Sequence, residues 1–577
     1  MRLFFRWIPA PAALADRPVA FVLLAGLVAV LLLFGPVQFM TGDEPRYLMY
    51  ALAFFRHGRF VMSLPEWDAV SRQVAHLPAT VLPAGGDGSV LMNGVYLPVL
   101  LAPVAGLLSL PGLRLVTLAT GLAGLFCLWR LLRRVAGPLP ALAATACAGL
   151  TVPLLPYLHL FYMETFLFAL VCWGWLRLQQ PKRGPAGDLL TAAILILVPV
   201  VHLRGAMVAA CLFLLLLRQI LDRGLLRRAL VLGGLGLLAA ALFVAANTAL
   251  YGAVTGPVNS ARPPLPWEWF PVLAMQLFNV HHGLLAYAPL WTLAYAGLWF
   301  GAWRNVPLAR QALLLGAVAA VTGIGMNPGE CWPARFWVLS VPMLSVGLCV
   351  WLAQARGSWS RLCAAILLAI TLANSVMFLR APNAFLDNRQ VSRTYTALFH
   401  STGLFDANVV LPVEIGDARN RAAARDLALG TGLFVLFAAL GLHRPRRAAP
   451  ALLLLLALLD CARVQRLHSA IASATATPTH LHLVLAAPMR EPVLHLGHPE
   501  QAWFLDIAWL HVTAEGGRAR RETLFGASPL LSVSCRSGVR SLDITSERLD
   551  LARQAAYRLT VDRSSSVLRR LLATDPC

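Results

Sequence analysis

Apolar runs of about twenty residues, repeated along the chain, limit what this sequence can fold into. A helix of that length is long enough to cross the roughly 30 Å hydrocarbon core of a bilayer. Hydropathy along the chain predicts thirteen such spans, and the sequence therefore predicts a polytopic α-helical membrane protein. The predicted spans lie near residues 18–40, 113–131, 139–157, 162–179, 188–203, 204–221, 229–250, 283–302, 308–325, 336–354, 362–379, 425–442 and 448–462.

The composition agrees with a membrane protein and argues against other classes. Of 577 residues, 58% are hydrophobic and only 13% are charged, and the mean hydropathy is +0.68. The net charge is +21, but the basic residues fall in small groups between apolar runs rather than in a stripe interleaved with aromatics, so no nucleic acid partner is predicted. The ten cysteines include no CxxC pair and no Cys/His cluster at zinc-ligand spacing.

Charge also predicts the orientation of the chain. The apolar run at 95–110 is ambiguous, because it could be a further span or an interfacial helix. If it lies on the outer surface, the loops assigned to the cytoplasm hold twenty cations against three acids, which are Asp16, Asp188 and Asp222. Counting it as a span would place those cations outside, against the positive-inside bias. We therefore predict thirteen spans, a cytoplasmic N-terminus and an outward-facing C-terminus.

The N-terminal segment carries Arg2, Arg6 and Arg17 before a long apolar run, as a secretory signal peptide does. The run at 18–40 is too long for the apolar region of a signal peptide and lacks a small-residue cleavage site. We therefore predict a retained first span.

Two domains are predicted. Residues 1–462 form the transmembrane domain, whose first external loop, 41–112, contains interfacial helices. From 463 to 577, short alternating runs such as HLHLVLA and WFLDIAWLHV predict a β-rich, sandwich-like domain outside the membrane. In that compartment Cys535 and Cys577 could pair. Two aromatic side chains there could stack on sugar rings or simply pack in the core, and these are Trp503 and Trp509.

The segment TGDEPRYLMYALAFFRHG, residues 41–58, predicts a helix immediately after the first span. Asp43 can cap it, Pro45 suits its first turn and Gly58 can end it. Its apolar face is typical of a helix lying in the headgroup plane and carries Leu48, Leu52 and Phe55.

The acids Asp43 and Glu44 admit two interpretations. Either they are solvated loop residues, with Asp43 serving only as the cap, or a carboxylate faces a cavity and takes a proton from an attacking alcohol. Glu164, in HLFYMET, is the only acid at the next outward turn. An acid so near bilayer depth is costly unless it faces a polar cavity, although a helix-start acid favoured by the helix dipole is the alternative.

Cations are sparse at the predicted outer span ends, where Arg46, Arg204 and Arg335 occur. Guanidinium groups suit phosphate oxygens, but each could equally be a snorkelling anchor. The adjacent pair His281 and His282 could ligate a divalent metal ion or lie at the interface, and the sequence does not decide whether a metal binds. Further candidates for the same cavity are Tyr47 and His159.

These segments resemble membrane-embedded glycosyltransferases of the GT-C superfamily, especially the protein O-mannosyltransferase and lipid A aminoarabinose transferase group. GDEPRYLMYALAFFRHGRF resembles the acidic motif of their first external loop. Softer similarities to bacterial members follow in the same order and are NGVYLPVLLAP, LWRLLRRVAG, HLFYMET, VVHLRGAMVA, HHGLLAYAPLW and PARFWVLSVPML. The likeness covers roughly residues 40–460, and the predicted thirteen spans and outward C-terminal domain are similar to that group.

The resemblance implies a bacterial inner-membrane enzyme that transfers a sugar from a polyprenyl-phosphate donor to a hydroxyl group of a glycan, lipid or protein acceptor. The transfer takes place on the outer face, with inversion. It implies that Asp43 activates the acceptor hydroxyl, with Glu44 as its neighbour and Glu164 as the acid of the second loop. Arg204 and Arg335 are then candidates for the donor phosphate.

One departure from the group's pattern bears on the acceptor. The aminoarabinose transferases carry Glu-Lys-Pro near the end of the first loop, where this chain has Tyr96, Leu97 and Pro98. The lysine expected near the phosphate is absent, which disfavours lipid A modification and any metal site built on that glutamate. The competing class is a lipid transporter or flippase, which tends to show matching halves and ionisable residues at mid-span. The sequence shows no internal repeat, and its charges lie at span ends.

Overall fold

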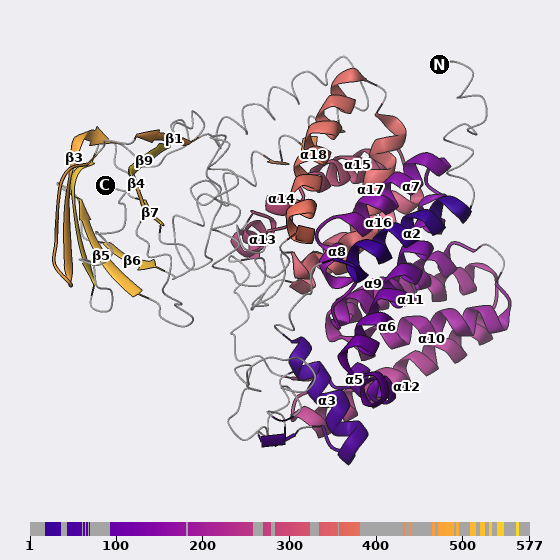
Figure 1. The fold of residues 1–577 in the computed structure, drawn as a ribbon. Coiled ribbons are helices and arrows are strands. Elements are labelled where there is room, and N and C mark those ends of the chain that lie inside the picture. Colours follow the sequence, from indigo (N-terminus) through magenta and orange to yellow (C-terminus); the bar gives the residue numbers. More distant parts are fainter. Residues whose placement is uncertain are drawn as a thin grey trace. The chain divides into compact units, whose positions relative to one another are not determined.

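Figure 1 shows the computed structural model of the chain. It describes residues 18–35, 43–60 and several up to 69, 93–180, 183–257, 269–278, 283–323, 334–355, 357–380, single positions in 431–439, and β-strands between 464 and 564. The chain divides into two compact units. The first comprises Met1–Trp269, Tyr287–Asn383 and Val435–Ala448, and the second comprises Phe270–Ala286, Ala384–Phe434 and Ala449–Cys577.

The first unit is helical. Its elements in the described residues are α2 (Pro18–Leu33), α3 (Glu44–His57), α5 (Tyr96–Leu100), α6 (Ala102–Leu132), α7 (Pro138–Leu150), α8 (Leu154–Tyr157), α9 (Met163–Leu178), α10 (Pro185–Val201), the 3-10 turn η2 (Leu203–Gly205), α11 (Ala206–Asp222), α12 (Leu226–Tyr251), α15 (Trp291–Trp303), α16 (Pro307–Gly323), the 3-10 turn η4 (Arg335–Ser340), α17 (Val341–Gln354) and α18 (Ser358–Arg380).

Several of these helices are suited to a bilayer. Five segments of the described chain are long and apolar enough to cross a membrane, and they are Ala102–Leu132, Leu203–Asp222, Leu226–Tyr251, Arg335–Gln354 and Ser360–Arg380. Shorter apolar helices cover Pro18–Leu33, Pro138–Leu150, Pro185–Val201 and Pro307–Gly323. The predicted run 448–462 and most of 425–442 lie outside the described residues, so the total of thirteen spans stays a prediction.

The ambiguous apolar run at 95–110 is helical and distinct from the span that follows it. It forms α5 and the first part of α6, and the helix breaks at Ser109, where φ is 57° and ψ is −153°. Pro111, two residues later, cannot donate an i→i−4 hydrogen bond, which favours a break at this point. Large side chains before the break are exposed, as expected beside lipid, and include Leu100, Leu107 and Leu108.

Helix α3 begins and ends where the sequence predicts. Asp43 is its N-cap, Pro45 lies in its first turn, and Gly58 ends it in the left-handed region at φ 64°, donating its N–H to the Phe54 carbonyl. Its environment differs from the prediction of a helix on the membrane surface. Most of its side chains, from Tyr47 to Ala53, are buried against the protein, while Phe55 is 46% exposed. The stretch from Tyr47 to Ala53 is therefore packed on all sides.

The central helices of the first unit pack against the elements that carry the candidate residues, with α3 on α6, η2 on α10, and η4 on α9 and α17. Helices α9 and α17 are buried along most of their length, and α9 packs against α6 and α10. Large aromatic side chains fill this core and include Trp129, Trp175, Trp291 and Trp351. Helix α12 is peripheral, because only 11% of its most apolar window is buried.

The second unit contains the strands, together with most of α13 (Trp269–Phe278) and α14 (Leu284–Tyr287). The strands are β1 (Val464–Leu467), β2 (Ile471–Ala476), β3 (His480–Met489), β4 (Pro492–His495), β5 (Ala508–Ala514), β6 (Arg520–Leu524), β7 (Leu530–Ser532), β8 (Val539–Ser546) and β9 (Val561–Ser564).

These strands form two antiparallel sheets with orders β1-β9-β4-β7 and β2-β3-β8-β5-β6. One face of the five-stranded sheet is buried and carries Leu481, Leu483, Leu485, Leu542 and Ile544, as the alternation of apolar residues predicts. Trp509 lies in β5, whereas Trp503, Cys535 and Cys577 lie outside the described residues. The domain boundary at 463 and a sandwich outside the membrane stay predictions.

Candidate active site

The carboxylate of Asp43 does not cap α3. Its side chain makes no capping hydrogen bond, although the residue occupies the N-cap position. Its Oδ2 instead lies 2.5 Å from Nη2 of Arg335, and its Oδ1 lies 3.4 Å from Nη1 of Arg46. The side chain is 16% exposed, so the carboxylate is mostly enclosed but still accessible. The alternative in which Asp43 serves only as a helix cap is not what the structure shows.

Arg335 joins Asp43 to the second acid that the sequence predicts, Glu164. The Nε of Arg335 donates to Oε1 of Glu164 at 2.6 Å, and Nη1 of Arg204 lies 3.6 Å from the same oxygen. Glu164 is in the first turn of α9 and is 2% exposed, and its Oε2 has no hydrogen-bond partner among the described residues. Two carboxylates and two guanidinium groups from α3, α9, η2 and η4 therefore meet at one place.

Aromatic rings hold the two guanidinium groups in position. The guanidinium of Arg335 lies 4.9 Å from the centroid of the Tyr162 ring, and that of Arg204 lies 4.4 Å from the centroid of the Phe336 ring. Arg204 also donates from Nη2 to the carbonyl of Phe336 at 2.7 Å. Planar arginines stacked in this way lose little entropy on binding an anion, because their orientation is already fixed.

The cations keep Asp43 ionised. Burial alone would raise the pKa of Asp43, but the charges of Arg335 and Arg46, with hydrogen bonds from Arg335 and Asn93, hold it below its ordinary value of 3.8. Burial and the Asp43 charge raise the pKa of Tyr47 well above its ordinary value, so that side chain stays a neutral phenol. Tyr47 packs edge-on against the rings of Phe161 and Tyr162.

Glu44 belongs to a second ion pair. Its two oxygens accept from Nε and Nη2 of Arg114 at 2.9 and 2.7 Å, and Oε1 also accepts the backbone N–H of Phe161 at 2.9 Å. The Glu44 side chain is fully buried. The structure thus holds Glu44 between α3, α6 and the segment before α9.

His159, predicted to line the same cavity, lies beside this second pair. Burial and the charge of Arg114 lower the pKa of His159 to about 4, against a smaller opposing effect of Glu44. His159 is therefore neutral at physiological pH. Its Nδ1 is buried and has no hydrogen-bond partner among the described residues.

His202 is close to the candidate site and was not predicted from the sequence. It lies between α10 and η2, and its Nδ1 accepts the backbone N–H of Arg204 at 3.1 Å. Because Nδ1 accepts, a neutral His202 carries its proton on Nε2. The signal that could have identified it is its position two residues before the predicted phosphate ligand Arg204.

The histidine pair and the metal question stay open. His281 and His282 lie outside the described residues. Within the part of the chain that the structure describes, no group of three or more His, Cys, Asp or Glu side chains is arranged to hold a metal ion.

No protein-family model matches the chain, and no curated protein matches it. Among solved structures, it is similar to ArnT from Cupriavidus metallidurans in the apo state, with a TM-score of 0.41 and 17% identity over 76% of this chain and 74% of that one. ArnT bound to undecaprenyl phosphate gives a TM-score of 0.39 and 19% identity over 78% and 76%.

The Archaeoglobus fulgidus oligosaccharyltransferase with Zn and sulfate gives a TM-score of 0.38 and 13% identity, over 63% of this chain and 53% of that one. ArnT and this oligosaccharyltransferase are GT-C membrane glycosyltransferases, the superfamily that the sequence motifs resemble.

Proposed function

We propose that the protein is an inverting glycosyltransferase that moves a sugar from a polyprenyl-phosphate donor to an acceptor hydroxyl at the outer membrane surface, with Asp43 as general base. The observation that carries the proposal is the position of Arg335, which contacts Asp43 and Glu164 together. One guanidinium, a group suited to phosphate, thus contacts both an ionised, partly accessible carboxylate and a buried one. Acceptor activation and leaving-group stabilisation are the two tasks that such a transfer needs.

The charge of the site fits the proposed donor. Three guanidinium groups, those of Arg46, Arg204 and Arg335, face two carboxylates, those of Asp43 and Glu164. One positive charge is left in excess, which matches the single negative charge of a sugar phosphodiester. As the bond to the sugar breaks, the phosphate gains negative charge, and fixed guanidinium groups stabilise that change more than they stabilise the bound donor.

The reaction follows from this arrangement. The acceptor hydroxyl donates its proton to an oxygen of Asp43 while its own oxygen forms a bond to the anomeric carbon of the sugar. The bond between that carbon and the phosphate oxygen breaks, and its electron pair leaves with the polyprenyl phosphate, which Arg335 and Arg204 bind. Attack occurs opposite the leaving phosphate, so a single displacement inverts the anomeric centre. Oδ1 is the better acceptor, because Oδ2 lies closer to Arg335.

The exposed apolar surface beside α3 fits a donor with a polyprenyl tail. Leu100, Leu107 and Leu108, on α5 and the first part of α6, are 71%, 76% and 60% exposed, and both helices pack against α3. A polyprenyl chain lying on this surface would lie beside α3, the helix that Asp43 precedes.

The test is to incubate the full-length protein in lipid nanodiscs with a panel of polyprenyl-phosphate sugars and to measure hydrolysis or transfer by mass spectrometry. Asp43→Asn keeps the shape but removes the base, and general-base catalysis contributes about 100- to 10,000-fold. We expect turnover to fall by about that factor. Asp222→Asn is the matched control, because Asp222 is 69% exposed in the last turn of α11.

Two outcomes would contradict the proposal. Full transfer activity in a folded Asp43→Asn variant would exclude Asp43 as the base. Movement of the lipid across the bilayer without cleavage of any sugar would instead identify a flippase.

A further inference from the structure

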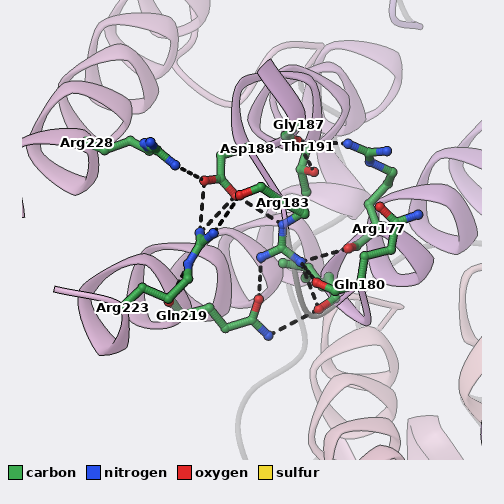
Figure 2. Close-up of polar contacts among 10 residues, drawn as sticks. Arg177, Gln180, Arg183, Gly187, Asp188, Thr191, Gln219, Arg223 and Arg228 are labelled. Atoms are coloured by element: carbon green, nitrogen blue, oxygen red, sulfur yellow. Dashed lines mark hydrogen bonds and ion pairs between the residues drawn. The ribbon is translucent and has the colours of Figure 1, made fainter. Parts of the chain in front are cut away.

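A second charged cluster surrounds Asp188, in the first turn of α10 (Figure 2). Asp188 is fully buried, and three guanidinium groups contact it. Its Oδ1 accepts from Nε of Arg183 at 3.1 Å, and its Oδ2 accepts from Nη2 of Arg223 and Nη1 of Arg228, both at 2.9 Å. The cluster therefore brings together the segment before α10, the end of α11 and the start of α12.

One carboxylate balances only one of these three charges. Arg183 is enclosed, with 3% of its side chain exposed, and its remaining N–H groups donate to the carbonyls of Arg177, Leu178 and Gln180 and to the Gln219 side chain. Arg223 and Arg228 are 28% and 26% exposed. Two positive charges are thus left in excess, and they lie on the accessible side of the cluster.

Arg228 has capacity for another ligand. Its contact with Asp188 is the only hydrogen bond or ion pair that it makes within the described residues. Figure 2 shows Arg228 and Arg223 approaching the same carboxylate from α12 and from the end of α11. The nitrogens of Arg223 already donate to the Gln219 carbonyl, the Arg183 carbonyl and Asp188. Holding two guanidinium groups on one buried oxygen is costly in a medium of low dielectric, and an anion bound by Arg228 beside Arg223 would reduce that cost.

The position of the cluster on α12 indicates which anion reaches it. Arg227 and Arg228 are in the first turn of α12, and Arg227 is exposed. The apolar side chains that follow face outward, with Leu230 67%, Leu237 76% and Leu242 62% exposed. Because α12 is long and apolar enough to cross a membrane, a bilayer around it would bring acyl chains to these leucines and lipid headgroups to the arginines.

We propose that Arg228, with the positive charges of Arg223 and Arg227 beside it, binds the phosphate of an anionic glycerophospholipid whose acyl chains lie along α12. Both parts of such a lipid have a matching surface. The positive charge of the arginines attracts the phosphate, and the exposed leucines contact the acyl chains. A zwitterionic lipid gains less, since its own cation repels the two excess charges. This site is separate from Asp43 and does not depend on the proposed transfer reaction.

The test is native mass spectrometry of the full-length protein with phosphatidylglycerol, phosphatidylcholine or inorganic phosphate. We expect the wild type to retain phosphatidylglycerol in preference to phosphatidylcholine, and Arg228→Gln to reduce that retention by about fivefold. Arg218→Gln is the matched control, because Arg218 is 78% exposed at the same end of α11 and pairs only loosely with Asp222, at 3.9 Å. It should retain phosphatidylglycerol as the wild type does.

Three results would overturn the inference. Equal phosphatidylglycerol retention by the wild type and Arg228→Gln would exclude the cluster as the site. Equal retention of the two lipids by the wild type would exclude recognition of the anionic headgroup. Binding of inorganic phosphate that depends on Arg228 and displaces the lipid at equal concentration would show a free phosphate site instead.

Discussion

Asp43 combines two properties that rarely coexist in one carboxylate, because it is enclosed by protein and yet remains ionised. Burial disfavours its charge, but Arg335 at 2.5 Å and Arg46 at 3.4 Å oppose that effect, so its pKa lies below 3.8. A proton acceptor with so low a pKa is a weak base that is fully available at neutral pH. Arg335 therefore determines both how completely Asp43 is ionised at neutral pH and how basic its carboxylate is.

Arg335→Gln tests this dependence through the pH profile. Asp43 must be ionised to accept a proton, so activity falls as the pH drops through its pKa, which in the wild type is below 3.8. Without Arg335, burial still raises the pKa, and the largest opposing charge is gone. We expect the acid limb of kcat/KM to move up by about 1 to 3 pH units. An unchanged limb would contradict the assignment.

Arg46→Gln is the graded control for that experiment. Arg46 lies farther from Asp43 and its side chain is 25% exposed, so solvent already weakens its effect. Its removal should move the acid limb less than the removal of Arg335 does. The two variants together separate the effect of a close, enclosed charge from that of a distant, solvated one.

Helix α3 depends on the buried pair of Glu44 and Arg114 for its position. Glu44 directly follows Asp43. The ion pair of Glu44 with Arg114 on α6 therefore also fixes where the Asp43 carboxylate lies. Breaking a buried pair leaves an uncompensated charge in a low-dielectric interior, which costs about 3 to 5 kcal/mol. Glu44 thus acts as a positioning residue in the proposed site.

Arg114→Met should lower the unfolding midpoint sharply, because it leaves the Glu44 carboxylate buried without its cation. The double variant Glu44→Gln with Arg114→Met should recover much of the loss, since glutamine is neutral and still accepts the N–H of Phe161. Thermal unfolding in detergent measures both. Arg59→Met is the control, because Arg59 and Glu66 form an exposed pair at 51% and 38%. An unstable double variant would show that the charge balance is not the cause.

The crossing of α15 and α17 gives a further test at the scale of helices. A Cβ atom added at Gly347 would collide with the backbone carbonyl oxygen of Ala294, which cannot move aside. Gly347→Ala should therefore separate the two helices and lower the yield of folded protein. Gly316→Ala in α16 is the control, because there the new atom would meet Met343 at an ordinary contact distance of 3.6 Å. Equal yields of the two variants would contradict this packing.

Local signals in the sequence were enough to predict α3 and its two ends. Its burial was not predictable, because an amphipathic face looks alike whether it meets lipid headgroups or the interior of the protein. The ion pairs of the candidate site could not be predicted from the sequence either. Arg335 and Glu164 are 171 residues apart, and Arg114 and Glu44 are 70 apart. The sequence named Asp43, Glu164, Arg204 and Arg335 one by one, and only the fold joins them.

Across the whole molecule, two helices separate the candidate site from the cluster around Asp188. Helix α9 carries Glu164 in its first turn and Arg177 in its last. The segment Leu203–Asp222 contains Arg204 as its second residue and ends next to Arg223, and its 20 residues span about 30 Å as a helix. That length equals the thickness of the hydrocarbon core. The two charged ends therefore match the two surfaces of one bilayer.

The ends of these helices near Asp188, Arg223 and Arg228 should face the cytoplasm, and the ends near Asp43 should face outward. Positive charge is retained on the cytoplasmic side of a membrane. In a cysteine-free background, Arg56→Cys marks the Asp43 end on α3, and Arg218→Cys marks the other end on α11; both positions are exposed. A membrane-impermeant maleimide applied to intact spheroplasts should label Arg56→Cys alone. Both should react after permeabilisation, which controls for access. The reverse pattern would place Asp43 in the cytoplasm and contradict transfer at the outer face.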